Sequence, residues 1–180
     1  VWESATSVIE HVGGDMPFLV AAVTMELNRP GLTLHLIIHP VLMVVRDAEG
    51  VLLRLARNGD TDAGRESVMH LEVDRRTDRA ELLALQQGLE QVLGDVRASV
   101  SDWPQMRDRM RDIIGGLVDM PASIEADELA EARDFLDWLA ADNFVLLGCR
   151  DYALTRGEEG DELRIVSGSG LGLLRGDGED

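Results

Sequence analysis

The sequence DMPFLVAAVTMELNRPGLTLHLIIH, residues 15–39, encodes a helix followed by a strand and decides the fold of the chain. Asp15 stands where the first free amide groups of a helix need an acceptor. Pro17 falls in the expected first turn, where the missing N–H costs nothing. Aliphatic residues then recur at helical spacing up to Leu27, and Asn-Arg-Pro-Gly at 28–31 ends the helix.

The pattern changes to that of a strand after this turn. The aliphatic residues that alternate with other side chains are Leu32, Leu34, Leu36 and Ile38. This alternation predicts that all four lie on one face of a strand, since successive side chains of a strand point to opposite faces. A shorter strand over residues 6–12 precedes the helix. The two strands and the helix between them form a strand–helix–strand unit.

The next sixty residues extend this unit. The expected elements are strands at 41–45 and 51–55 around a turn at 47–50, a polar connector at 57–65, a strand at 68–73, and a helix that begins at Asp78 and runs to Val96. This order predicts the α+β class, with an ACT-like (ferredoxin-like) antiparallel sheet that carries its helices on one face. We expect a first domain over residues 1–100.

The remaining sequence indicates more helix and a small pair of strands. Ser-Asp-Trp-Pro at 101–104 is a start signal for a new helix, and Met120-Pro121 ends it. The elements expected after that are a helix at 124–141, a strand at 144–152, and a strand at 163–166 across an acidic turn. The expected divisions are therefore a connecting helix at 101–122 and a helix with a strand pair at 123–180.

Composition excludes several classes of function. The formal net charge is −17, which argues against binding to nucleic acid or to an anionic membrane surface, because both attract clustered positive charge. No apolar run approaches the ~20 residues of a membrane span, and no leader sequence opens the chain. The one cysteine excludes an internal disulfide and a zinc site built from cysteines. We expect a cytoplasmic protein.

The chain contains no lysine, so all seventeen basic residues are arginines. A phosphate-binding lysine and a Schiff base are therefore excluded. Gly168-Ser-Gly-Leu-Gly172 suggests a dinucleotide-binding loop, but position 173, where a third glycine is needed, is Leu173. No catalytic residue and no cofactor are expected in this chain.

The histidines raise the question of a metal site. His35 and His39 fall on the same face of the expected strand, and His70 and His11 would lie on strands beside it. Three imidazoles on one sheet face could bind zinc. No short ligand pair of the HExxH kind fixes such a geometry, so we favour a plain sheet surface and expect no metal.

Two further blocks and the opening segment carry a resemblance to a known family. Asp15, Pro17, Leu19, Leu27, Gly31, Leu32 and Leu34 fall in register with the ACT-domain signature, and Phe18 departs from it. The blocks EARDFLDWLAADNFVLLGCRDYAL (131–154) and GSGLGLLR (168–175) resemble the N-terminal region of the large bacterial NAD-specific glutamate dehydrogenases.

The resemblance implies that this chain is a noncatalytic N-terminal segment for regulation or assembly. NAD and the oxidative deamination of glutamate to 2-oxoglutarate would belong to a catalytic domain elsewhere in the parent chain. The partners would be the remainder of that chain and other subunits of a homo-oligomer. The alternative is a free-standing amino-acid-binding regulator or a small metal-dependent enzyme, and the length of the reading frame would separate the two.

The candidate site is the turn before the first helix, with Gly14, Asp15, Met16 and Phe18 as its residues. A helix N-terminus offers unpaired amides that suit the carboxylate of an amino acid, and in ACT domains an effector occupies this loop. The family's glycine is Phe18 here, and its ring could fill the space that a ligand needs. We favour a structural role, in which Asp15 caps the helix and Phe18 fills the cavity, over effector binding.

Overall fold

The computed structural model describes residues 5–57, 60–117, 124–157 and 160–176, and contacts divide the chain into two compact units. The first unit is Val1–Val96 and the second is Arg97–Asp180. We describe each unit separately. The domain boundaries expected at residues 100 and 122 stay predictions, because a compact group of contacts need not be a segment that folds on its own.

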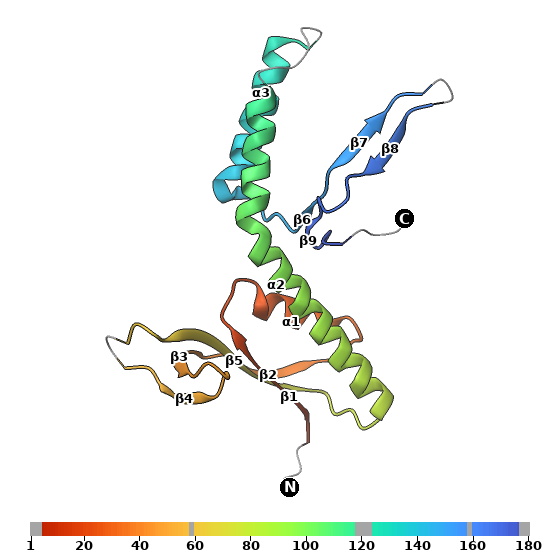
Figure 1. The fold of residues 1–180 in the computed structure, drawn as a ribbon. Coiled ribbons are helices and arrows are strands. Elements are labelled where there is room, and N and C mark those ends of the chain that lie inside the picture. The colour runs from red at the N-terminus through yellow and green to blue at the C-terminus, as the bar shows by residue number, and fades with distance from the viewer. Residues whose placement is uncertain (1–4, 58–59, 118–123, 158–159, 177–180) are drawn as a thin grey trace. The chain divides into compact units, whose positions relative to one another are not determined.

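The first unit is an antiparallel sheet with two helices, which confirms the predicted α+β class (Figure 1). Its elements are β1 (Ser7–Gly14), α1 (Leu19–Asn28), β2 (Leu34–Ile38), β3 (Val41–Arg46), β4 (Leu52–Leu55), β5 (Gly64–Val73) and the first part of α2 (Arg79–Gly116). β5 is the central strand. It pairs with β1 along one edge and with β2 and β3 along the other, and β4 pairs with β3.

The core lies between the helices and one face of β5. The buried side chains that alternate along β5 are Ser67, Met69, Leu71 and Val73. The helix side chains that meet this face are Leu19, Val23 and Leu27 of α1 and Leu89 of α2. Both helices therefore cover the same face of the sheet, as the sequence predicted. Burial fixes these helix faces, because each large aliphatic side chain removed from water contributes roughly 1.5–3 kcal/mol.

A β-bulge in β2 corrects the expected strand face. Leu34 pairs with Val73, but the register shifts before Leu36, which pairs with Glu72. Leu34 and Ile37 consequently pack against the core, while Leu36 and Ile38 lie on the opposite, exposed face. The prediction of four aliphatic side chains on one face is therefore wrong, because one extra residue in a strand reverses the side chains that follow.

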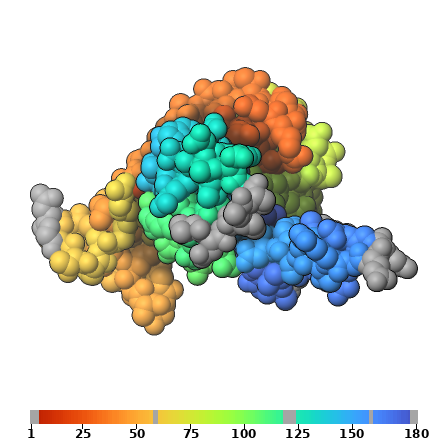
Figure 2. Space-filling view, turned by 90° about the horizontal axis from the view of Figure 1, so that it is seen from above, coloured from red at the N-terminus to blue at the C-terminus, as the bar shows by residue number. Residues whose placement is uncertain are grey.

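The β3–β4 hairpin places apolar side chains at the surface. Leu52, Leu53 and Leu55 of β4 are all exposed, and the yellow and orange atoms of this hairpin are visible in the space-filling view (Figure 2). Asp47 stabilises the turn by accepting hydrogen bonds from the amides of Glu49 and Val51.

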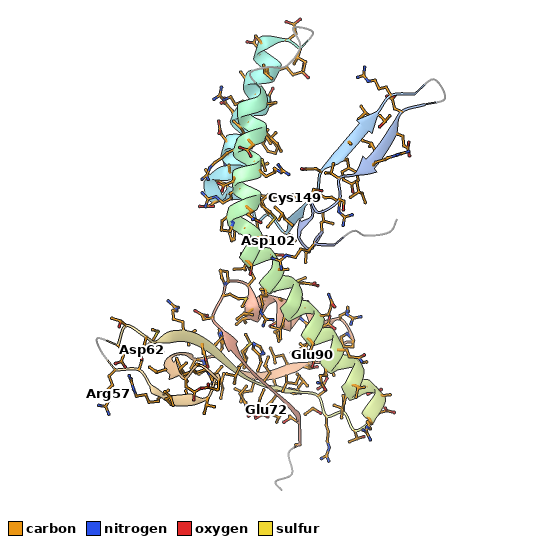
Figure 3. All side chains as sticks on the ribbon, viewed as in Figure 1. Arg57, Asp62, Glu72, Glu90, Asp102 and Cys149 are labelled. Atoms are coloured by element: carbon orange, nitrogen blue, oxygen red, sulfur yellow. The ribbon has the colours of Figure 1, made fainter. Side chains whose placement is uncertain are left out.

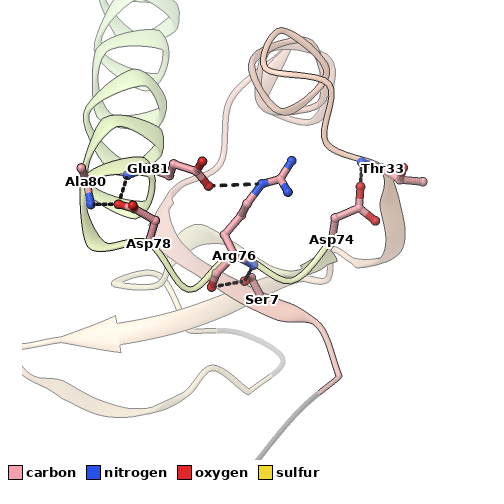
Figure 4. A network of polar contacts seen from close by, with 7 residues as sticks. All are labelled: Ser7, Thr33, Asp74, Arg76, Asp78, Ala80 and Glu81. Carbon is pink, nitrogen blue, oxygen red and sulfur yellow. Dashed lines mark hydrogen bonds and ion pairs between the residues drawn. The ribbon is translucent and has the colours of Figure 1, made fainter.

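The start of α2 agrees with the sequence. The Asp78 carboxylate accepts hydrogen bonds from the amides of Ala80 at 2.7 Å and Glu81 at 3.3 Å, which is the geometry of an N-cap (Figure 4). Ser7 holds the preceding loop, because its hydroxyl accepts the Arg76 amide proton, with 2.8 Å between the heavy atoms.

The middle of α2 contradicts the sequence prediction of two helices. We expected a break at 101–104, but α2 continues through Pro104 to Gly116. A proline inside a helix removes one hydrogen bond and costs about 3 kcal/mol. Packing compensates for this cost, since Asp102, Met106 and Ile114 are buried in the second unit.

The second unit contains the rest of α2, two helical segments and two small strand pairs. Its other elements are α3 (Ala126–Trp138), the π-helical turn η2 (Leu139–Asn143), β6 (Gly148–Cys149), β7 (Tyr152–Thr155), β8 (Glu162–Ile165) and β9 (Leu171–Gly172). β7 pairs with β8 as predicted, and β6 pairs with β9. The expected strand at 144–152 is wrong in extent, because it is interrupted and only residues 148–149 and 152 onward have strand geometry.

Asp102 joins the C-terminal residues of this unit to α2 (Figure 3). Its buried carboxylate accepts hydrogen bonds from the Gly172 amide at 2.8 Å and from the Arg175 guanidinium at 2.8 and 2.5 Å. These bonds hold the pKa of Asp102 below its usual value, with the Arg175 bond as the larger cause. Within the described ranges, no helix combines the length and apolar character required to cross a membrane.

Candidate functional site

The candidate site is the turn that joins β1 to α1 in the first unit. It contains all four residues that the sequence singled out, Gly14, Asp15, Met16 and Phe18. Gly14 is the last residue of β1, and Leu19 is the first residue of α1. The turn therefore lies at the end of one strand and beside the N-terminus of a helix, which is where an anion would meet free amide groups.

Asp15 is bound to the first residues of β5 through both its backbone and its side chain. Its amide donates to the Arg65 carbonyl oxygen at 3.1 Å. Its carboxylate accepts a hydrogen bond from Arg65 Nε at 3.1 Å and lies 2.8 Å from Arg65 Nη2. Asp15 and Arg65 are fifty residues apart in the sequence, so no local pattern indicated this pair. Asp15 therefore fixes the turn to the sheet.

The helix start differs from the sequence prediction. Phe18 occupies the N-cap position and its side chain makes no capping hydrogen bond. The expected cap by Asp15 and the expected place of Pro17 in the first turn are both wrong. Proline pushes the residue before it toward an extended conformation, so the chain at Met16 has not yet entered the helix and Asp15 is too early to cap it.

Phe18 has a backbone conformation that is unusual for a side chain of its size. Its φ is 71°, in the left-handed region, where a β-carbon crowds the backbone. The ACT signature has glycine at this position, and glycine adopts this conformation without strain. Phe18 is 43% exposed. Its ring is therefore partly open to solvent at the turn and does not lie in the core.

Two hollows of the first unit lie away from the candidate turn. One, of about 290 Å³, is lined by residues of α1, of the loop after it, of the β5–α2 loop and of α2, including Glu26, Arg29 and Arg76. The other, of about 440 Å³, lies between β1 and α2. Neither is lined by any of the four predicted site residues.

The buried carboxylate of Glu26 was missed by sequence reasoning. It accepts hydrogen bonds from Arg29 Nε at 2.9 Å and Nη2 at 2.7 Å. These bonds lower the pKa of Glu26, and burial opposes them. The spacing of three residues on a helix was the signal that could have indicated the pair.

The histidines have separate partners. His35 Nε2 lies 2.8 Å from Asp74 Oδ1, and His39 Nε2 lies 2.6 Å from Ser67 Oγ. His70 Nδ1 lies 3.3 Å from a carboxylate oxygen of Glu10. Within the described ranges, no group of three or more histidine, cysteine, aspartate or glutamate side chains has the arrangement to hold a metal ion.

Gly170 and Gly172 serve close backbone packing in the second unit. A β-carbon at Gly170 would overlap the Leu174 carbonyl oxygen, and one at Gly172 would overlap that of Leu147. Gly172 also has a φ of 61°. Nearby Cys149 is partly buried, and desolvation raises the pKa of its thiol. This environment favours the neutral thiol over the reactive thiolate.

Comparison with known proteins assigns this sequence to a family. A family model described as "Glutamate dehydrogenase, ACT1 domain" matches residues 1–89. The chain is 41% identical over 177 residues to the NAD-specific glutamate dehydrogenase of Halomonas elongata, and 36% identical over 176 residues to that of Pseudomonas aeruginosa. It is 27% identical over 175 residues to the NAD-specific glutamate dehydrogenase of Mycobacterium tuberculosis.

These similarities extend over nearly the whole chain but over a small part of each relative. The first two cover 97% of this chain and the third covers 96%. The chain spans 11% of the length of the first two relatives and 10% of the third. The chain therefore belongs to the large NAD-specific glutamate dehydrogenase family, as an N-terminal region that includes its ACT1 domain.

Proposed function

We propose that this chain is a regulatory and assembly segment of a large glutamate dehydrogenase in the cytoplasm. The parent enzyme would convert glutamate, NAD and water to 2-oxoglutarate, ammonia and NADH in a catalytic domain outside these residues. The observation that carries this proposal is the ACT1 match over residues 1–89, in a chain that spans 11% of relatives named for that activity. The absence of lysine from the chain supports a catalytic centre elsewhere.

The proposed partners are the remainder of the parent chain and other subunits of a homo-oligomer. The sheet face opposite the helices supports this proposal, because Val12, Leu36 and Ile38 are exposed on it. Exposed apolar side chains on one face favour a contact with another protein surface. The net charge of −17 argues against nucleic acid or an anionic membrane as a partner.

The alternative role of the β1–α1 turn is to bind an effector, and the chemistry of the turn would suit an amino acid. Its carboxylate would meet the free amides at the start of α1, and its ammonium group would share the Asp15 carboxylate with Arg65. The existing ion pair between Asp15 and Arg65 favours the structural role of the turn, because a ligand must compete with it. We therefore expect no amino acid to bind at this turn.

A thermal-shift assay with the twenty amino acids tests this expectation. A ligand at 100 times its dissociation constant stabilises the folded state by about 2.7 kcal/mol. The matched variants are Asp15→Ala, at the turn, and Asp47→Ala, which removes the aspartate of the β3–β4 turn. A shift that Asp15→Ala abolishes and Asp47→Ala keeps would show that the turn is an effector site.

A further inference from the structure

One edge of the sheet in the first unit is open. β1 lies at the end of the strand order and pairs with β5, and no other described strand pairs with it. In the β-α-β-β-α-β plan, a last strand follows the second helix and pairs with the free edge of the first strand. Here α2 continues past Val96 to Gly116 instead of returning to the sheet. The position of that last strand is therefore vacant among the described residues.

A groove lies along this open edge. Four successive residues of β1, at 8–11, form one wall, and α2 forms the other. The groove has a volume of about 440 Å³ and contains Val23 and Leu71 among its lining residues. It combines a strand edge with which no other described strand pairs and an apolar helix face, and an added strand would cover both surfaces. The apolar residues of the α2 wall are Leu82, Leu85, Leu89 and Leu93.

The polar residues of the groove indicate the charge of its occupant. Glu10 of β1 is highly exposed and pairs with His70, so its side chain lies on the sheet face opposite the helices, whereas the exposed Glu90 of α2 lines the groove on the helix side (Figure 3). Gln86 donates a hydrogen bond to Glu90 at 2.8 Å, and His70 approaches Glu10. No arginine is among the described residues that line this groove. A strand with basic residues beside its apolar residues would complement it.

We propose that a strand from the part of the parent enzyme outside this sequence pairs with the free edge of β1. Its apolar side chains lie beneath α2, where one basic residue can meet the exposed Glu90, and the basic side chains of its other face lie beside Glu10. The length of the relatives supports this occupant, since this chain spans only 11% of each of the first two. A second copy of β1 is disfavoured, because it would bring another Glu10 to the same edge, and like charges on neighbouring strands repel. The proposal rests on the family assignment and not on effector binding.

Hydrogen–deuterium exchange of the full-length enzyme tests the proposal. If β1 has a partner strand on each edge, all its amides are protected from exchange. If one edge is open, alternate amides of β1 remain exposed to solvent. We expect the peptide over residues 7–14 to exchange all its amides at least about tenfold more slowly than an unfolded peptide. Fast exchange of half of these amides in the wild-type enzyme would overturn the proposal.

Two neighbouring leucines of α2 provide matched variants in the full-length enzyme. Leu82 lines the groove and is 40% exposed, whereas Leu83 is 48% exposed and does not line it. We expect Leu82→Asp to accelerate exchange of alternate β1 amides about tenfold or more, while Leu83→Asp leaves them unchanged. Equal effects of the two variants would contradict a strand in this groove.

A photo-crosslinker attached at Glu10→Cys identifies the occupant in the same enzyme. Capture of a peptide from outside residues 1–180 supports the proposal. Capture of residues 7–14 of a second copy, detected in mixed isotope-labelled subunits, overturns it in favour of self-pairing. Both results are independent of glutamate turnover, so the strand proposal can fail while the proposed enzymatic function stands.

Discussion

Single residues at the β1–α1 turn show which local signals can be read from sequence. Pro30 and Gly31 correctly indicated the end of α1 and the change from helix to strand. The role of Asp15 was not readable, because its partner Arg65 comes from a strand fifty residues later. Phe18 was recognised as a departure from the family pattern, but its left-handed backbone required coordinates.

The backbone of Phe18 leads to a stability prediction. We compare Phe18→Gly with Phe18→Ala, since both remove the ring but only glycine removes the β-carbon. At a φ of 71° the β-carbon crowds the backbone, so we expect the glycine variant to be more stable by about 1–2 kcal/mol. Urea unfolding of the two variants measures this difference. Greater stability of the alanine variant would show that the turn relaxes to a negative φ.

Whole elements were predicted where a short-range pattern controls them. Asp78 marked the start of α2, and alternation identified β5. The bulge in β2 and the passage of α2 through Pro104 were not predicted, because pairing with β5 decides the first and burial of Met106 and Ile114 supports the second. Local propensity gives way to tertiary packing in both cases.

The link between α2 and β9 leads to a prediction at this scale. Asp102→Asn weakens the charged hydrogen bonds to Arg175 and Gly172, and we expect it to lower the free energy of unfolding by on the order of 1–3 kcal/mol at pH 7. The variant keeps nearly the same shape. The decrease in the free energy of unfolding therefore reports the contribution of the carboxylate charge. Chemical unfolding in urea measures this decrease.

The same substitution has a defined pH dependence. The pKa of Asp102 is lower in the folded protein than in the unfolded chain, so its stabilisation is present above the unfolded pKa and disappears as the pH falls through the folded pKa. The difference between wild type and Asp102→Asn should be constant from pH 7 to about pH 5 and shrink below about pH 4. A difference that stays constant down to about pH 2 would contradict the assigned ionisation.

At the scale of the molecule, the fold class and the family could be predicted from sequence, because several blocks and one periodic pattern agree. The open edge of β1 could not be predicted from sequence, because it arises only if no strand after α2 pairs with β1. The candidate turn was located correctly between β1 and α1, but its internal contacts were not predicted. Both features depend on contacts between residues far apart in the sequence, which local patterns do not indicate.

The exposed sheet face leads to a prediction about association. We expect the isolated chain to self-associate with rising concentration, because Ile38 is 50% exposed on that face, which also carries the exposed Leu36 and Val12. Ile38→Glu should shift sedimentation toward the monomer. Met25→Glu is the control, since Met25 is a 72% exposed apolar residue of α1. A chain that remains monomeric at high concentration leaves only the rest of the parent to cover this face.

The central claim, that these residues support a glutamate dehydrogenase without performing its chemistry, is tested most directly by glutamate-dependent NADH formation. The purified 180-residue chain, shown to be folded by cooperative thermal unfolding, is compared with the full-length parent enzyme under identical conditions. We predict steady NADH formation by the parent and none above the blank by the chain. Turnover of glutamate and NAD by the folded chain alone would contradict the claim.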